Sequence, residues 1–360
     1  MVCALIDSGG ERTRNSQMLN KSRTAFVKLK PLKLHPSTGV RLSPKYGQHL
    51  TINPGVVDTM IQAADIRSTD TVLEIGCGSG NITMKLLPIA RKVIVIELDT
   101  RFAEETEQRA IALGFDNLEV IKGDATKVSY PSFDVCVANP SYNISSLLIF
   151  KLAANPYWRR SILMLQKEFA DRLVADPGNK EFSRLSMNAS LYFRTERVMK
   201  VSGGSFYPQS AVQSMIVRLI PRFPRPTFDF REWDGLMRIL FLQRRRALHA
   251  VLSKPQVMAM LEVNYKTWCV INERLPALMS FPDYVLSTLE ELRVDRICAK
   301  KISAEKMQKI LQAFHAKGLF FSSVAAEPVQ AVKSFEDGIL DALEEGEEEG
   351  MNEEECLNGS

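Results

Sequence analysis

A four-residue segment, Asn139-Pro140-Ser141-Tyr142, carries groups suited to handling an aromatic amine. It ends an apolar run that begins at Phe133 and whose composition predicts a buried strand. The side-chain oxygen of Asn139 and the backbone carbonyl of Pro140 can each accept one N–H bond from an exocyclic amino group, which frees the nitrogen lone pair for attack. The ring of Tyr142 can stack on the base, a contact worth about 1–3 kcal/mol. The competing interpretation is that Asn139-Pro140 only opens a turn.

Upstream of this segment, a second apolar strand leads into a glycine-rich turn within Asp70 to Gly80, DTVLEIGCGSG. Gly76, Gly78 and Gly80 allow the backbone to turn tightly and to approach a ligand closely. Their G-x-G-x-G spacing differs from the G-x-G-x-x-G fingerprint of dinucleotide-binding proteins. The next strand, KVIVIELD, contains Glu97, 21 positions after Gly76, close to the interval at which an acid accepts the two hydroxyls of a ribose. This pattern predicts a site for the adenosine half of a cofactor.

A third expected strand, Leu118 to Ala125, brings another acid to the same region. Asp124, near the end of this strand, is placed to accept a hydrogen bond from an adenine amino group. Glu97, Asp124 and Asn139 all follow expected parallel strands, and the carboxyl ends of such strands form the ligand-binding edge of the sheet. The ordered series therefore predicts an enzyme that uses a nucleoside cofactor.

The composition is that of a globular chain with 45% hydrophobic and 24% charged residues, and its 360 residues can form one medium domain and a smaller one. No apolar run approaches the roughly 20 residues needed to span a membrane, so we expect no integral membrane protein. The six cysteines are scattered and the four histidines do not cluster, so neither a disulfide framework nor a metal site is expected.

The charge is segregated along the chain. Residues 1–46 carry a net charge of +7 and residues 322–360 a net charge of −11, which leaves +8 on the body between them. A basic body with a basic arm favours a polyanionic partner such as a nucleic acid, although any single cluster can be only a solvated face. A mitochondrial presequence is the competing interpretation of the arm, and Pro31 and Pro36 speak against it because they interrupt a long amphipathic helix.

Four regions are expected: a basic disordered arm (1–45), an α/β domain (46–222), a helical region (223–321) and an acidic disordered tail (322–360). The proline-rich segment RFPRPTFDF marks the boundary between the two folded parts. Strands are expected in SILMLQ, ERVMKVS and AVQSMIVRLIP, helices in Ile82 to Leu87, EFADRLVA and RLSMNASLYF, and Phe206 is expected in a loop. The region from Trp233 to Phe321 should be mostly helical and contains the basic run Arg244, Arg245 and Arg246.

From about Tyr46 to Phe321 the chain resembles the ribosomal RNA adenine dimethyltransferases. The resemblance rests on GQH, VLEIGCGSGNIT, ELD, GDA, NPSYNIS, LQKEFADRLVADPG, RLSMN and FYPQSAVQS. It implies a Rossmann-like S-adenosylmethionine-dependent methyltransferase sheet with a smaller, mostly helical C-terminal domain. REWDGLMRILF and LQAFHAKGLFF are closer to the eukaryotic nuclear branch than to the bacterial one, which implies a nuclear and nucleolar protein of ribosome biogenesis.

The family uses S-adenosyl-L-methionine to methylate N6 of two adjacent adenosines, twice each, near the 3′ end of small-subunit rRNA. By position, the resemblance implies that the cofactor pocket is formed by Gln48, His49, Thr51, Gly76, Gly78, Glu97, Asp124 and Asn139. Tyr142 and Phe206 would enclose the target adenine, next to the acceptors on Asn139 and Pro140. The helical region with Arg244, Arg245 and Arg246 would bind rRNA within a pre-ribosomal particle. We expect a monomer.

The chain departs from the family pattern near the target pocket. The usual Asn-(Leu/Ile)-Pro-Tyr is Asn-Pro-Ser-Tyr here, the Phe-x-Pro-Pro-Pro loop is reduced to Phe206-Tyr207-Pro208-Gln209-Ser210, and position 51 is Thr instead of Leu. Two alternatives stay open at this point. They are an RNA-binding assembly factor of the small subunit with weak or lost catalysis, and a mitochondrial rRNA methyltransferase or transcription-factor relative. A protein-glutamine methyltransferase also uses an Asn-Pro-Pro-Tyr site, but the basic arm and the C-terminal region would then have no purpose.

Overall fold

A computed structural model describes residues 50–155 and 157–322 of the chain. Its strands are β1 (Leu50–Thr51), β2 (Thr71–Ile75), β3 (Lys92–Glu97), β4 (Leu118–Lys122), β5 (Val135–Ala138), β6 (Arg160–Gln166), β7 (Phe193–Val201), β8 (Phe206–Tyr207) and β9 (Ser214–Pro221). The predicted arm and tail, and with them Gln48 and His49, lie outside the described residues.

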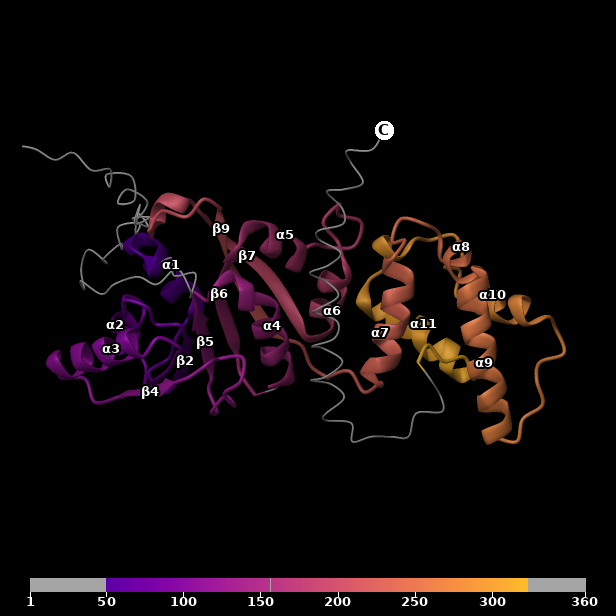
Figure 1. The fold of residues 1–360 in the computed structure, drawn as a ribbon, viewed down its shortest axis with the longest axis horizontal. Helices are drawn as coiled ribbons and strands as arrows, with labels where there is room; N and C mark the ends of the chain where they lie inside the picture. Colours follow the sequence, from indigo (N-terminus) through magenta and orange to yellow (C-terminus); the bar gives the residue numbers. More distant parts are fainter. Residues whose placement is uncertain (1–49, 156, 323–360) are drawn as a thin grey trace, which may run out of the picture.

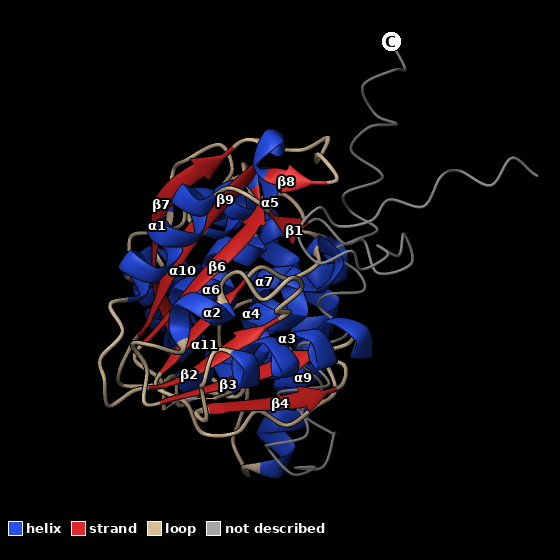
Figure 2. Ribbon diagram, turned by 90° about the vertical axis from the view of Figure 1, so that its left-hand side faces the viewer, coloured by secondary structure: helices blue, strands red, loops and turns tan. Residues whose placement is uncertain are grey.

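Seven strands form one sheet in the order β4-β3-β2-β5-β6-β9-β7 (Figure 2). Strands β2 to β6 pair in parallel, and β9 runs antiparallel to both of its neighbours. After β2 the chain adds β3 and then β4 on one side of it. The chain then returns and adds β5 and β6 on the other side of β2, so the strand order reverses between β2 and β5. A ligand crevice is expected at such a switch point, outside the carboxyl ends of the strands.

The central strands are buried on both faces, as their continuous Val, Ile and Leu sequences predict. On one face Val72, Val93 and Val135 belong to a hydrophobic cluster with residues of α1 (Pro54–Ala64), α2 (Thr83–Leu86) and α3 (Thr100–Ala112). On the other face Leu73 and Ile94 join a cluster with α4 (Ser145–Ala154), α5 (Lys167–Leu173) and α6 (Arg184–Tyr192). The result is a three-layer α/β arrangement (Figure 1).

The C-terminal part is helical, as the sequence predicts. It contains α7 (Phe230–Phe241), α8 (Leu248–Leu252), α9 (Pro255–Ile271), α10 (Phe281–Glu291) and α11 (Ala304–Ala316). The indole N–H of the fully buried Trp233 donates to the Asn188 side-chain oxygen of α6 over 2.8 Å. The helical part shares its hydrophobic cluster with one face of the sheet, so α6 and α7 join the two parts through a continuous core (Figure 1). The predicted boundary at residue 222 falls between β9 and α7.

Two sequence predictions differ from the structure. Phe206 was expected in a loop, but it lies in β8, which pairs antiparallel with β1 through the partners Leu50 with Tyr207 and Thr51 with Phe206. The predicted helix over RLSMNASLYF ends at Tyr192, and Phe193 begins β7. A two-residue strand has no periodic pattern to detect, because only pairing with a distant segment defines it.

No helix in the described part of the chain combines the length and the apolar character needed to cross a membrane.

Candidate functional site

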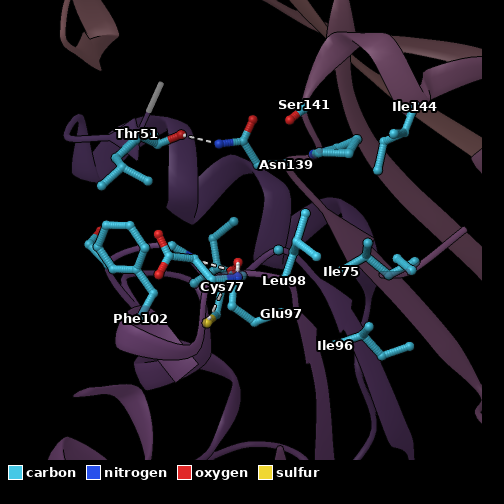
Figure 3. Close-up of a pocket in the computed structure, with 18 of the residues that line it drawn as sticks. Thr51, Ile75, Cys77, Ile96, Glu97, Leu98, Phe102, Asn139, Ser141 and Ile144 are labelled. Carbon is cyan, nitrogen blue, oxygen red and sulfur yellow. Dashed lines mark hydrogen bonds between the residues drawn. The ribbon is translucent and has the colours of Figure 1, made fainter. Parts of the chain in front are cut away.

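A cavity lies at the carboxyl ends of β2, β3, β4 and β5 and is closed on one side by β1 (Figure 3). Of the sequence-predicted residues, it is lined by Thr51, Gly76, Gly78, Glu97, Asp124, Asn139, Pro140 and Tyr142. The predicted cofactor and acceptor residues that the structure describes therefore share a single cavity. Except for Thr51, which lies in β1, they come together because each lies at or just after the carboxyl end of a parallel strand of the same sheet.

The glycine turn after β2 forms the floor of the cavity and requires glycine at two positions. Gly76 and Gly78 have φ values of +77° and +50°, a region that side chains rarely adopt. A Cβ on Gly78 would also lie 2.5 Å from Cδ2 of Leu50, because β1 packs directly on the turn. Because Gly76 and Gly78 have no side chains, a ligand can come close to the backbone of this turn.

Glu97, the last residue of β3, is held by backbone donors from two sides. Its Oε2 accepts a hydrogen bond from the Gly78 N–H over 3.1 Å, and its Oε1 accepts one from the Asp99 N–H over 2.9 Å. Burial raises the pKa of Glu97, and these hydrogen bonds counteract part of that rise. The carboxylate is thereby oriented beside the glycine turn, where it can accept the hydroxyls of a ribose.

Asp124 follows β4 and also lines the cavity. The backbone N–H and the hydroxyl of Thr126 both donate to its Oδ1, over 2.9 and 2.7 Å. Partial burial raises the pKa of Asp124, but these two bonds and the nearby Lys127 and Lys151 outweigh burial, so its pKa lies below the ordinary range. Because both bonds end on Oδ1, Oδ2 can accept from a ligand in the cavity.

The loop that carries Asp124 is held by the ammonium group of Lys151, a half-buried residue of α4. Lys151 Nζ donates to the carbonyls of Ala125, Thr126 and Val128 over 3.0, 3.0 and 2.6 Å. The same group lies 4.5 Å from the ring centroid of Tyr130. Lys151 thus connects the helix after the Asn-Pro-Ser-Tyr segment to the wall of the nucleoside site. Sequence reasoning missed it, because no local pattern marks which carbonyls a distant lysine will reach.

The acceptor segment lies at the end of β5, at the mouth of the cavity. Asn139 is half-buried and its Nδ2 donates to Thr51 Oγ1 over 3.1 Å, while Pro140 is buried. Tyr142 begins a short 3-10 helix, and its hydroxyl lies 2.6 Å from the hydroxyl of Ser214 in β9. Ser214 is fully buried and was not singled out from the sequence.

Phe206 does not line this cavity. Its side chain is 2% exposed and packs with Val201 and Ile216 in the hydrophobic cluster on the α1 face of the sheet. The described structure therefore brings Tyr142 to the cavity mouth without placing Phe206 opposite it. The physical reason is that β8 pairs with β1, and this pairing buries the ring.

The predicted RNA-binding arginines lie in the turn between α7 and α8, on the helical part of the molecule (Figure 1). Arg245 and Arg246 are exposed. Arg244 instead donates from its guanidinium to the Phe182 carbonyl over 3.2 Å, so it helps to join the two parts of the chain.

Within residues 50–155 and 157–322, no three His, Cys, Asp or Glu side chains gather in a way that could hold a metal ion.

The sheet order, the glycine turn and the acids at successive strand ends define the α/β Rossmann-like class of methyltransferases, as expected from the sequence. The crystal structure of the 23S rRNA methyltransferase ErmE shares this fold, with a TM-score of 0.55 at 22% identity, over 74% of this chain and 99% of that one.

The chain belongs to the ribosomal RNA adenine dimethylase family, whose model matches residues 39–289. It is 42% identical over 287 residues to a probable dimethyladenosine transferase of Drosophila melanogaster, covering 79% of this chain and 94% of the relative. It is 39% identical over 289 residues to the dimethyladenosine transferase of Schizosaccharomyces pombe, with coverage of 79% and 94%. The crystal structure of a dimethyladenosine transferase from Plasmodium falciparum matches with a TM-score of 0.72 at 45% identity, over 76% of this chain and all of that one. The family expected from the sequence is confirmed.

Proposed function

We propose that this protein transfers methyl groups from S-adenosyl-L-methionine to N6 of two adjacent adenosines near the 3′ end of small-subunit rRNA, dimethylating each. The observation that carries the proposal is the position of Asn139 and Pro140, which directly follow β5 and line the same cavity as Glu97 and Asp124. The family and the names of its relatives support the same activity.

The residues of the cavity fit this cofactor. Glu97 would accept the ribose hydroxyls, Asp124 would accept from the adenine amino group, and the open backbone at Gly76 and Gly78 would admit the methionine part. When bound, the cofactor supplies an electrophilic methyl group on a sulfonium. The buried position of Glu97 would also strengthen its hydrogen bonds to the ribose, because water competes less there.

The chain's own residues would prepare the acceptor nitrogen. In the first transfer the amide oxygen of Asn139 and the carbonyl of Pro140 each accept one N–H bond, which draws the nitrogen toward tetrahedral geometry and directs its lone pair away from the ring. The nitrogen loses one proton to solvent as it gains the methyl group, so in the second transfer the single remaining N–H bond goes to one of the two oxygens. The ring of Tyr142 stacks on a base removed from its helix and holds it in this position. Alignment and electrostatics therefore provide most of the rate enhancement, and no covalent enzyme intermediate is needed.

A direct test incubates the purified protein with labelled cofactor and small-subunit rRNA that lacks the modification. The expected product is label in N6-dimethyladenosine, identified by mass spectrometry of the nucleosides. Asn139→Ala should abolish turnover while rRNA binding, measured by calorimetry, stays within a few-fold of wild type. Absence of labelled N6-methylated adenosine, under conditions where the cofactor binds, would refute the proposal.

A second candidate function is an assembly factor of the small subunit whose RNA binding matters more than its catalysis. The burial of Phe206 outside the cavity favours it, since the target base would then be stacked from one side only. The two functions differ in cells that lack the wild-type protein. An Asn139→Ala copy would restore small-subunit maturation if assembly is the main role, and would fail if methylation is required.

We further propose that the protein acts as a monomer on a pre-ribosomal particle in the nucleolus. The eukaryotic nuclear character of its C-terminal region supports this location over the mitochondrial one. Imaging of a tagged copy tests the location, and light scattering of the purified protein tests the monomer.

A further inference from the structure

Thr51 lies where three segments of the site meet. Its carbonyl accepts a hydrogen bond from the side chain of Asn81, which follows the glycine turn, over 2.9 Å. Its backbone pairs with Phe206 across the β1–β8 ladder. Its hydroxyl oxygen accepts from Asn139 Nδ2 over 3.1 Å, and the residue is only 5% exposed. The backbone of Thr51 is therefore held in place by contacts that do not involve Asn139.

The Asn139 amide has its nitrogen toward Thr51 and its oxygen on the other side (Figure 3). This orientation matters because rotation about the last side-chain torsion of Asn is soft and two-fold. If the amide turned over, its NH2 group would face the amino group of the acceptor base, donor against donor. With the oxygen on the side away from Thr51, both ends of the amide can be satisfied, since the hydroxyl of Thr51 can accept and the base can donate.

We propose that Thr51 is a positioning residue that keeps the oxygen of Asn139 directed at the acceptor amine. This inference rests on the proposed function, because it assigns a role to a residue that acts through Asn139. It also gives a reason for the departure at position 51. The leucine that the resemblance implies there can fill the same space, but it cannot accept a hydrogen bond from an amide.

The activity test compares Thr51→Val, which keeps the shape and removes the hydroxyl, with Thr51→Ser, which keeps the hydroxyl. A neutral hydrogen bond of this kind corresponds to a change of up to about tenfold. We expect kcat on small-subunit rRNA to fall about tenfold in Thr51→Val and to return to within about threefold of wild type in Thr51→Ser.

Ser205→Ala is the matched control. The Ser205 hydroxyl accepts from the Asn53 side chain over 3.3 Å and its carbonyl accepts from the Ile52 N–H over 2.9 Å, so it secures the same strand pair without touching Asn139. We expect its kcat to stay near that of wild type. An equal loss in Ser205→Ala and Thr51→Val would show that the effect comes from loosening the strand pair, and would overturn the proposal. So would an unchanged kcat in Thr51→Val.

A measurement without substrate separates this inference from the proposed function. In protein with ¹⁵N-labelled asparagine, the side-chain amide signal of Asn139 is identified by its loss in Asn139→Ala. We expect its protons to exchange slowly with solvent in wild type and in Thr51→Ser, and about tenfold faster in Thr51→Val. Equal exchange in all three proteins would overturn the role of Thr51. Absence of turnover in wild type, with the exchange difference present, would instead refute the proposed function and leave the hydrogen bond established.

Discussion

The hydroxyl of Tyr142 lies 2.6 Å from the hydroxyl of Ser214, which joins the loop after β5 to the first residue of β9. Ser214 is fully buried, so it forms a rigid partner for a tyrosine at the mouth of the cavity. A phenol that is fixed at its far end loses little further freedom when a base stacks on its ring. The contact thus prepares the aromatic surface that the proposed reaction needs.

Two substitutions of Tyr142 distinguish the role of its ring from the role of its hydroxyl. We expect Tyr142→Ala to reduce kcat/KM for rRNA by about 1–3 kcal/mol, the usual contribution of one stacked base, and Tyr142→Phe to reduce it by no more than about 1 kcal/mol. Methylation rates at several rRNA concentrations measure both values. Equal losses in the two variants would mean that the hydroxyl, and not the ring, is the important group.

Removal of the Lys151 ammonium should loosen the wall that carries Asp124. Lys151→Met leaves the carbonyls of Ala125, Thr126 and Val128 without their donor, so we expect about 1–3 kcal/mol lower stability and about tenfold weaker cofactor binding. Urea unfolding and calorimetry measure the two quantities. Lys127→Met, at an exposed neighbour of Asp124, changes the charge equally and should leave both nearly unaltered. Similar effects in the two variants would attribute the loss to charge alone.

Stability should depend on pH through Glu74, a fully buried residue of β2 whose Oε2 accepts from the Thr83 hydroxyl over 2.7 Å. Burial raises the pKa of Glu74 from 4.5 to about 8. Because the folded state holds this proton more tightly than the unfolded chain does, its stabilising effect is complete below about pH 4.5 and is lost as the pH rises to about 8.

Glu74→Gln removes this titration. We therefore expect the free energy of unfolding of wild type to decrease relative to that of Glu74→Gln across this pH range, by up to about 1.4 kcal/mol per pH unit. Urea titrations of both proteins at about pH 5, 6, 7 and 8 give the difference. A difference that stays constant with pH would show that Glu74 is ionised in the folded protein at all these values.

The exposed arginines between α7 and α8 should contribute to RNA binding through phosphate contacts. Changing Arg245 and Arg246 together to Ala should weaken rRNA binding and reduce the slope of log affinity against log salt by about 2. A double change of Arg67 and Lys92 removes the same charge at the amino ends of the strands, away from the cavity, and should leave the slope unchanged. Equal slopes for the two double variants would count against an RNA contact at this turn.

The local sequence was sufficient to predict which residues lie at the ligand-binding edge of the sheet. Gly76, Glu97, Asp124 and Asn139 could be assigned to one cavity because each follows an apolar strand, and parallel strands present their carboxyl ends to the same side of a sheet. This inference needs only patterns of a few residues. The helical C-terminal part could also be predicted, since its apolar residues recur at helical spacing over long segments.

Only the tertiary structure decided how the site is supported. The pairing of β1 with β8 buries Phe206 and brings Thr51 to Asn139, and Ser214 reaches Tyr142 from 72 positions along the chain. Such contacts join short segments that carry no periodic signal, and their partners depend on how the chain packs as a whole. Side-chain chemistry and spacing were therefore sufficient to predict the residues of the candidate site. The orientation of their side chains depends on contacts between distant parts of the fold.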